Sequence, residues 1–433
     1  MKKRLNVNKT LLICFIVGFV VFANLNLEAG DSNNKDAVRI YNLSDCINIA
    51  LEKNPELLAS KQQVEKSFFK IGEARSGYFP DINLSLGYQR SYQEMKVPEH
   101  YSKNYSGQIT LSQRLFDFGK TSTQVDIQKE LYKATDSQNR ETLLGLIYNV
   151  KEAYFSLLKA KKQKETAEEV LKQAKKHLDL ARGFYEVGLK PKIEVTKAEV
   201  ELSNAKLNLI TAEKNQRQAL LNLKIAMGAI YDEDFDIKEE DYVIRKIEEK
   251  EALKIAQERN PQLQSVRFNR QASIYSEELV KKEYLPTFSG TGRYGYSGEN
   301  FPLDRGWSVL LEVNIPIFSG WSTTYRLKQA KADVAYYLHK EESLKQQITS
   351  QIKNLFIQLK ESSQRIETLK TALKQAKENL DLAMGRYEVG VGSSIEVVDA
   401  IVLYEQTNTQ YWQAIYDYNV TYASIEKIVG IEK

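Results

Sequence analysis

Apolar and polar residues follow two different periods along this chain, and the changes of period mark the predicted elements. In residues 120–182 and 321–384 the apolar positions recur about every 3.6 residues, the spacing of a helix, and no proline interrupts either run. Shorter runs of the same kind follow at 193–227 and 395–429. At about 1.5 Å per residue, the second long run predicts a helix of roughly 95 Å. Such helices expose a long apolar seam, so we expect them to pack side by side.

Four other stretches alternate with a period of two residues, which predicts strands with one apolar and one polar face. We predict these strands at about 81–92, 105–116, 287–297 and 307–316. Each spans about ten residues, the length that a tilted strand needs to cross a bilayer. Aromatic residues near the ends of such strands are typical of a membrane interface, and the candidates are Tyr78, Phe79, Tyr284 and Trp307.

Shorter helices precede the strands. The first is predicted at 43–51, with Ser44 and Asp45 as candidate N-cap residues, and the second from Pro55 to about Gly77. An Asn-Pro dipeptide separates these two helices, because the residue before a proline avoids the helical conformation. The same dipeptide recurs at 260–261, before a helix predicted at 261–282.

The chain is an internal duplication. Residues 171–198 and 373–400 share the blocks Leu-Lys-Gln-Ala-Lys, Leu-Asp-Leu-Ala, Gly-x-Tyr-Glu-Val-Gly and Ile-Glu-Val at identical spacing. In each copy a helical run meets a glycine-rich break and then a second helical run, which predicts a hairpin of two helices. Gly188 and Gly390 are placed to end the first helix of each hairpin, since glycine readily adopts the left-handed conformation found there.

We therefore divide the chain into four parts. Residues 1–29 read as a secretory signal peptide, because basic residues precede an apolar core that is short for a membrane helix. An uncleaved N-terminal anchor is the alternative. Residues 30–228 form the first repeat, with a helical turn at about 183–192. Residues 229–250 form an acidic linker with little regular structure. Residues 251–433 form the second repeat, with a turn at about 385–394.

The composition argues against several classes of function. The net charge is +4 on a chain that is 27% charged, so nucleic acid is not an expected partner. The three histidines, His100, His177 and His339, are scattered and none has metal-ligand spacing. There is no glycine-rich phosphate loop. We therefore do not expect the chain to be an enzyme, and we expect no metal site and no cofactor.

The strands set a geometric condition on the assembly. Four strands cannot close into a barrel, because a ring that small has no room for an interior. An open sheet would leave unpaired edges, which lipid does not tolerate. We expect several chains to pool their strands in a membrane and to contact its lipid. A sheet packed on helices in water is the alternative, because it gives the same alternation.

Taken together, these features resemble the TolC-type outer-membrane efflux family along nearly the whole mature chain. The duplication carries the resemblance, together with the Asn-Pro segments at 54–57 and 260–263 and the segment Ile-Pro-Ile-Phe-Ser-Gly at 315–320. The most specific segment is Tyr-Glu-Val-Gly at 387–390, followed by Ile-Glu-Val-Val-Asp-Ala at 395–400.

The resemblance implies a mainly α-helical fold with a membrane β-barrel portion. A homotrimer would form a twelve-stranded outer-membrane barrel, continuous with an α-helical tunnel in the periplasm. The implied function is the passive channel of a tripartite efflux or type I secretion system, gated at its periplasmic tip. Its partners would be a periplasmic adaptor (membrane fusion) protein and an inner-membrane transporter of the RND, ABC or MFS type.

The resemblance also implies roles for individual residues. Glu396 and Asp399 match the acidic residues that ring the constriction, and Tyr387 matches a tyrosine whose hydrogen bond helps to hold the gate shut. Glu186 matches one partner of a gating ion pair. The expected partner is an arginine, but Gly392 occupies that position in this chain. Lys190 or Arg386 is available as a replacement. The turn residues implied to contact the adaptor are Val187, Gly188, Leu189, Val389, Gly390 and Val391.

Each of these assignments has an ordinary structural alternative. Glu396 and Asp399 lie three residues apart, which is also the spacing of an ordinary solvated pair on a helix surface. For the whole chain, the main alternative is a periplasmic coiled-coil adaptor without a pore, and an enzyme is a distant third. The sequence predicts no particular substrate.

Overall fold

In the computed structural model, residues 40–433 form one unit, and this unit is described below. The described chain leaves out residues 1–38, 94–99, 231, 233–234, 240–247 and 432–433. The predicted signal peptide therefore lies outside the described residues, as does part of the acidic linker.

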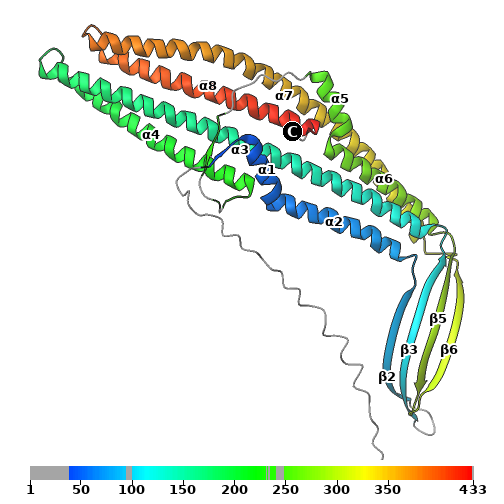
Figure 1. Cartoon of the computed structure of the whole chain (residues 1–433). Coiled ribbons are helices and arrows are strands. Elements are labelled where there is room, and N and C mark those ends of the chain that lie inside the picture. The colour runs from blue at the N-terminus through cyan, green and yellow to red at the C-terminus, as the bar shows by residue number, and fades with distance from the viewer. Residues whose placement is uncertain (1–38, 94–99, 231, 233–234, 240–247, 432–433) are drawn as a thin grey trace, which may run out of the picture. The chain divides into compact units, whose positions relative to one another are not determined.

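Two helical hairpins dominate the unit (Figure 1). The long helices α3 (Lys120–Glu186) and α7 (Ser322–Glu388) have 67 residues each, and the returning helices α4 (Lys192–Met227) and α8 (Ser394–Val429) have 36 each. Helix α3 packs against both α4 and α8. The returning helices cover only about half of each long helix, as the sequence predicted.

The shorter helices cover the remaining halves of the long ones. Helix α2 (Pro55–Ser76) packs on α3, and α6 (Pro261–Lys282) packs on both α3 and α7. Helices α1 (Leu43–Lys53) and α5 (Glu249–Arg259) precede them. Every helix of the first repeat has a counterpart of equal length in the second, so the duplication extends to the three-dimensional structure.

The N-cap of α1 is Asn42, so the prediction of Ser44 or Asp45 as the cap was wrong. The Asn42 side chain accepts a hydrogen bond of 2.8 Å from the Asp45 backbone nitrogen. The Asp45 carboxylate in turn accepts one of 3.0 Å from the Asn42 backbone nitrogen. This reciprocal capping box places Asp45 in the first turn of the helix, where its negative charge is favourable.

The acidic segment after α4 contains regular structure that the sequence did not predict. Strand β4 (Asp236–Ile237) pairs in parallel with β1 (Ile40–Tyr41). Phe235 and Ile237 are buried in a core that includes Tyr154 of α3. Lys161 of α3 holds the Asp236 carboxylate at 2.8 Å. A two-residue strand is too short to produce a visible period, so the sequence could not reveal it, and among the described residues the linker otherwise has little regular structure before α5.

Four strands form an antiparallel sheet in the order β2-β3-β5-β6. Strand β2 is Asp81–Gln93, β3 is His100–Phe116, β5 is Thr287–Gly298 and β6 is Asp304–Asn314. Strand β3 begins five residues before the predicted position, because its polar start still pairs with β2 as far as His100. The predicted hairpins, β2-β3 and β5-β6, are confirmed.

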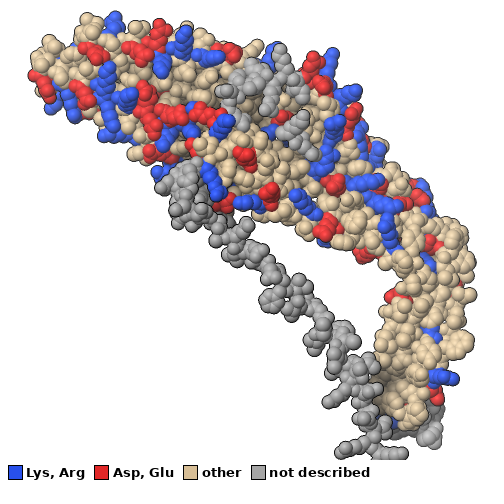
Figure 2. Space-filling model, viewed as in Figure 1, with Lys and Arg blue, Asp and Glu red and all other residues tan. Residues whose placement is uncertain are grey.

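The register gives the sheet two chemically different faces. Leu84, Ile109, Tyr294 and Trp307 lie side by side across the four strands on one face. Leu86 and Trp307 on this face are each 77% exposed. Figure 2 shows Lys, Arg, Asp and Glu side chains spread densely over the helices and thinly over the sheet. No described part of the chain covers the apolar face of the sheet.

Among the described residues, no helix has the length and the apolar content that crossing a membrane requires.

Candidate functional site

The candidate site is the tip, which we define as the ends of α3, α4, α7 and α8 that adjoin the two hairpin turns. Gly188 has φ of +79° and Gly390 has φ of +84°, the left-handed conformation predicted for both. The Gly188 nitrogen donates to the Tyr185 carbonyl, and the Gly390 nitrogen donates to the Tyr387 carbonyl. These bonds close equivalent turns after the two long helices.

The turns present apolar residues to solvent. The exposed fractions of Val187 and Leu189 are 69% each, and those of Val389 and Val391 are 73% and 69%. The two intervening glycines are also exposed. All six predicted adaptor-contacting residues therefore lie on the accessible surface of the tip.

Small residues allow the two hairpins to approach closely behind the turns. Ala174 and Ala181 of α3, Ala198 of α4 and Ala400 of α8 are all essentially inaccessible to solvent. They belong to one buried cluster that includes residues of all four helices. The tip is therefore a packed core that joins the repeats, and not two independent hairpins.

Tyr387 is the largest fully buried side chain of this core. Its ring packs edge-on against His177 and Phe184 of the other hairpin, with centroids 4.8 and 5.7 Å away. The Lys190 ammonium lies 5.8 Å from its ring centroid. Burial, together with the negative charge of Glu194, raises the pKa of the Tyr387 hydroxyl to about 12. The Tyr387 hydroxyl therefore stays protonated at physiological pH. It has no hydrogen-bond partner of regular geometry among the described residues, so within one chain Tyr387 joins the hairpins through its ring and not through the hydrogen bond that the resemblance implies.

His177 is a tip residue that the sequence analysis missed. Its side chain is fully buried, and its Nε2 atom lies 3.2 Å from the Ser394 hydroxyl of α8. The Ser394 backbone nitrogen donates to the Glu194 carboxylate at 3.2 Å. Burial lowers the pKa of His177, while the charge of Glu194 acts in the opposite direction. The sequence did contain a signal for this residue. The two repeats differ here, because the second repeat has Asn379 at the position that His177 occupies in the first.

Glu396 and Asp399 are both exposed near the start of α8. Glu396 lies 3.5 Å from the Arg386 guanidinium, an ion pair between α7 and α8. No hydrogen bond or ion pair of Asp399 with another described residue is present. Within one chain, the two carboxylates therefore remain accessible to ions.

The replacement ion pair considered for Glu186 is not formed. Glu186 is exposed and has no ion pair among the described residues. Arg386 is paired with Glu396, and Lys190 donates to the Gly392 carbonyl at 3.0 Å. Gly392 itself packs against backbone, since a Cβ atom there would lie 2.8 Å from the Tyr387 nitrogen. The family's arginine does not fit this backbone arrangement.

A second pair of acidic residues lies deeper between the hairpins. Glu201 of α4 is 9% exposed, and Glu405 of α8 accepts a hydrogen bond of 3.0 Å from Asn208. Burial raises the pKa of both carboxyl groups, and the charge of Glu405 raises that of Glu201 further. The two carboxyl groups lie where α4 and α8 meet, and the sequence analysis did not single them out.

The predicted interface aromatics lie on the surface of the sheet or beside it. Tyr78 and Phe79 precede β2, and Tyr284 precedes β5, so these three are close to the helical end. Trp307 lies within β6 on the apolar face, opposite Tyr294. All four side chains are exposed.

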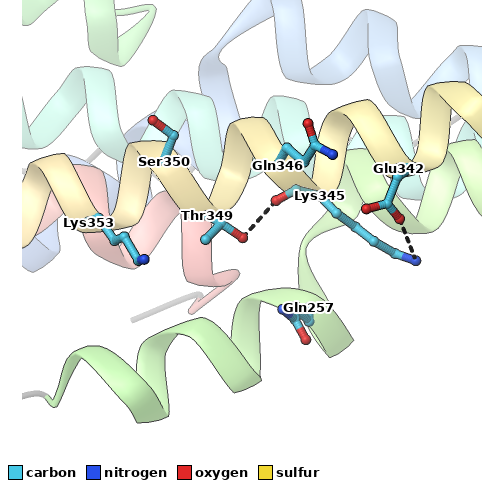
Figure 3. A pocket seen from close by; sticks show the side chains of 7 residues that line it. All are labelled: Gln257, Glu342, Lys345, Gln346, Thr349, Ser350 and Lys353. Atoms are coloured by element: carbon cyan, nitrogen blue, oxygen red, sulfur yellow. Dashed lines mark hydrogen bonds and ion pairs between the residues drawn. The ribbon is translucent and has the colours of Figure 1, made fainter.

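The described surface shows no concentrated catalytic chemistry. An open groove of about 460 Å³ lies between α5 and α7 (Figure 3), and it is lined by Gln257, Glu342, Lys345, Gln346, Thr349, Ser350 and Lys353. These are flexible polar side chains, and the Thr349 hydroxyl is already bonded to the Lys345 carbonyl at 2.8 Å. No group of three His, Cys, Asp or Glu residues suited to a metal ion occurs in the described part of the chain.

Comparisons with known proteins give a consistent result. The family described as "Outer membrane efflux protein" matches residues 46–229 and 252–431. The outer membrane protein TolC of Vibrio cholerae is 24% identical over 407 residues, covering 91% of this chain and 92% of TolC. TolC of Escherichia coli is 25% identical over 405 residues, covering 90% and 82%.

Solved structures share the fold at lower identity. The outer-membrane channel OprN has a TM-score of 0.79 at 18% identity and covers 90% of this chain and 89% of its own. The Campylobacter jejuni CmeC outer membrane channel has a TM-score of 0.78 at 18% identity and covers 99% and 94%. The predicted combination of long helical hairpins and a small sheet is therefore confirmed.

Proposed function

This chain belongs to the outer membrane efflux protein family, and we propose that it is the trimeric channel of a tripartite efflux or type I secretion system. Membership makes it an outer-membrane efflux channel with periplasmic helices, and not an enzyme. The alternative of a periplasmic adaptor without a pore does not agree with this family. In the proposed system the channel is passive, and an inner-membrane transporter acts on it through a periplasmic adaptor.

The observation that carries the trimer is the pair of open sheet edges, β2 and β6. Inside the chain, the second strand of repeat one (β3) pairs with the first strand of repeat two (β5). In the described part of the chain, the edges without a partner strand are β6, the second strand of repeat two, and β2, the first strand of repeat one. In the duplication β6 is the counterpart of β3, and β2 is the counterpart of β5. The pairing of β3 with β5 is therefore a template for pairing β6 with β2 of the next copy.

The template predicts the register between copies. Ile109 and Tyr294 are paired inside the chain, and their counterparts in the opposite repeats are Leu311 and Tyr88. Leu111 and Gly292 are also paired, and their counterparts are Val313 and Leu86. In both predicted pairs the two residues lie on the apolar face of the sheet. The joined sheet therefore keeps one apolar and one polar face.

The number of copies follows from the interior that a conduit needs. Two four-stranded sheets would give about eight strands, and side chains fill a barrel of that size. Three copies give twelve strands, which leave room for a water-filled passage and agree with the family resemblance. The polar face of the sheet, with Ser85 opposite Gln108, then lines this passage.

The helices support the same assembly. Helix α3 packs against α6 and α8 within the chain, so the template places α7 against α2 and α4 of the next copy. Apolar side chains are exposed on those helices: Phe68 and Phe69 on α2, Leu207 and Ile210 on α4, and Ile357 on α7. A neighbouring copy would cover these otherwise unexplained apolar residues.

Disulfide cross-linking tests the register. We expect the double variant Leu311→Cys, Tyr88→Cys to form covalent dimers and trimers under mild oxidation, seen by non-reducing electrophoresis. Leu311→Cys combined with Leu84→Cys is the matched control. Its second cysteine lies on the same face but about 13 Å further along the strand, at roughly 3.3 Å per residue. Equal cross-linking of both pairs, or monomers only, would contradict the proposed join.

We propose further that Glu396 and Asp399 form the acidic constriction at the periplasmic end. The support is their exposure, their shared position on α8 and their match to the family's acidic residues. Six such carboxylates around a threefold axis would attract cations and repel one another. The exposed turns, in turn, would offer the adaptor Val187, Gly188, Leu189, Val389, Gly390 and Val391.

Neutralising the constriction should change cation block. In planar bilayers, we expect Glu396→Gln with Asp399→Asn to weaken block by divalent cations added from the periplasmic side by about tenfold or more. Asp333→Asn, an exposed site far along α7, is the control and should behave as the parent channel. If block by divalent cations were unchanged in the double variant, the assignment of Glu396 and Asp399 to the constriction would be wrong.

A further inference from the structure

We propose that His177 makes the contact between the two hairpins of the tip sensitive to pH, so that mild acid favours the open tip. In the closed tip the side chain packs as a neutral ring, and a proton on it would create a positive charge that water cannot reach. The inference rests on the proposed function, because it treats the tip as the gate of a channel. It goes beyond that function by assigning regulation of the gate to a residue other than the carboxylates of the constriction.

The first observation is the position of His177 between the hairpins. The residue belongs to α3 of the first hairpin, and its side chain is fully buried. Its ring packs edge-on against Tyr387 of α7, with the centroids 4.8 Å apart, and its Nε2 atom lies 3.2 Å from the Ser394 hydroxyl of α8. A change in the charge of this one ring therefore acts on both helices of the second hairpin.

The second observation is the hydrogen bonding of the ring. Nε2 has the Ser394 hydroxyl as its partner, whereas the buried Nδ1 atom has no hydrogen-bond partner among the described residues. A neutral imidazole carries a proton on one nitrogen only, so the ring can donate from Nε2 and leave Nδ1 unprotonated. The charged form carries a proton on both nitrogens. In the closed tip it would bury a charge and also an N–H group without an acceptor.

The third observation is that the charged groups facing the ring do not offset its burial. Glu194 of α4 favours the protonated form, but burial is the larger effect and lowers the pKa of His177. The Glu194 carboxylate already accepts a hydrogen bond of 3.2 Å from the Ser394 backbone nitrogen. On α7, the pKa of the Tyr387 hydroxyl is raised to about 12, so this group carries no charge. The Lys190 ammonium in the turn, 5.8 Å from the Tyr387 ring centroid, opposes a second positive charge.

Two further pairs of charges join the helices of the tip. Lys176, the neighbour of His177 on α3, forms an ion pair of 3.0 Å with Glu388 of α7. Arg386 of α7 forms one of 3.5 Å with Glu396 of α8. In each pair the two charges already balance each other. Neither pair therefore supplies a free carboxylate that would stabilise a protonated His177.

The direction of the pH effect follows from linkage. In the closed tip the pKa of His177 lies below its ordinary value, and in an open tip water would return it toward about 6.5. The open tip therefore binds the proton more strongly. The contribution of His177 to closure is complete above about pH 6.5 and is lost as the pH falls toward the lowered pKa. Within this window, each unit of pH shifts one chain toward opening by up to about tenfold.

The buried acids of the same helices would act in the opposite direction. Burial raises the pKa of Glu201 on α4 and of Glu405 on α8, and the charge of Glu405 raises that of Glu201 further. A proton on either group removes the repulsion between them and therefore does not favour separation of α4 from α8. Opening in mild acid is thus an expectation specific to His177.

Hydrogen exchange at two pH values tests the inference. The full-length protein in detergent would be compared with His177→Gln, which keeps a hydrogen-bonding side chain but does not titrate. The quantity measured is the ratio of the exchange rates, parent over variant, for amides at the start of α8. The intrinsic pH dependence of exchange cancels in this ratio. We expect the ratio to be about tenfold larger at pH 5.5 than at pH 7.5.

His339→Gln is the matched control, with the same substitution at an exposed histidine of α7. It should exchange like the parent at both pH values. A second variant, His177→Phe, covers the case in which glutamine loosens the tip even at pH 7.5. Phenylalanine keeps an edge-on ring against Tyr387 and also does not titrate. A ratio that is the same at pH 5.5 and pH 7.5 for both His177 variants would overturn the inference.

The outcome is separable from the proposed function, because exchange reports on the tip whether or not the protein conducts. In planar bilayers, the parent channel should be open more often at pH 5.5 than at pH 7.5, and His177→Gln should lack this increase. A channel that conducts, but whose exchange ratio does not change with pH, sinks only the role of His177. A chain that conducts at neither pH sinks the proposed function, and the exchange ratio then still decides whether His177 responds to protons.

Discussion

Replacing Tyr387 by alanine is expected to lower the free energy of local opening at the tip by about 3–5 kcal/mol, the usual cost of emptying a large buried aromatic site. The side chain is fully buried, and its ring joins α7 to His177 and Phe184 of the first hairpin. Without it, the hairpins lose their largest shared side chain and His177 gains access to water. The channel should then open more often at its periplasmic end.

Hydrogen exchange and conductance measure this effect together. Amides at the start of α8 should exchange much faster in Tyr387→Ala, and the mean single-channel conductance should rise. The matched control is Tyr185→Ala, which removes the corresponding tyrosine of the first hairpin. Tyr185 is 46% exposed, so its loss should cost less than about 1 kcal/mol.

The conservative variant separates the ring from the hydroxyl. Tyr387→Phe keeps both edge-on ring contacts, and the hydroxyl of the parent has no hydrogen-bond partner of regular geometry among the described residues. It should therefore resemble the parent far more than the alanine variant does. An alanine variant that exchanges and conducts like the parent would show that Tyr387 does not hold the hairpins together.

The helices could be predicted closely because their signal is long. Helix α3 was expected at 120–182 and is Lys120–Glu186, since dozens of residues with one period outweigh any local ambiguity. The duplication added independent support, because each element was seen twice. Short features had no such support. The cap of α1 and the pairing of β1 with β4 depend on single residues, so the period carried no information about them.

At the tip, the sequence identified the turns but not what joins them. Gly188, Gly390 and Tyr387 belong to a repeated motif and could be recognised. His177, Glu194 and Ser394 act through contacts between segments about two hundred positions apart, and only the folded chain brings them together. The same limit applies to the sheet. Alternation predicted two faces, whereas the register that places Arg90 opposite Lys103 required the structure.

The glycines near the tip differ in how much room they leave for a larger side chain. Gly183 and Gly385 have open space around the position of a Cβ atom, whereas Gly392 is enclosed by the backbone of Arg386 and Tyr387. Glycine within a helix is less favourable than alanine, so an alanine at either open position should stabilise its helix. At Gly392 the sign should reverse, since backbone atoms cannot move aside as a flexible side chain can.

Substituting Gly392 by alanine is therefore expected to destabilise the closed tip by about 1–3 kcal/mol, the usual cost of overpacking. A Cβ atom at this position would lie 2.8 Å from the Tyr387 nitrogen and 3.0 Å from the Arg386 carbonyl carbon. The turn must shift to relieve this contact. That shift would also move the Gly392 carbonyl away from Lys190, which now donates to it at 3.0 Å.

Gly385→Ala is the matched control, seven residues earlier and inside α7, and it should stabilise that helix by about 0.5–1 kcal/mol. Hydrogen exchange of the tip amides distinguishes the two, with faster exchange in Gly392→Ala and slower exchange in Gly385→Ala. Gly392→Arg should be at least as damaging as the alanine, although it restores the residue type expected from the family. If the arginine variant instead slowed exchange, the backbone around this turn would have to be more adaptable than the close packing against Tyr387 indicates.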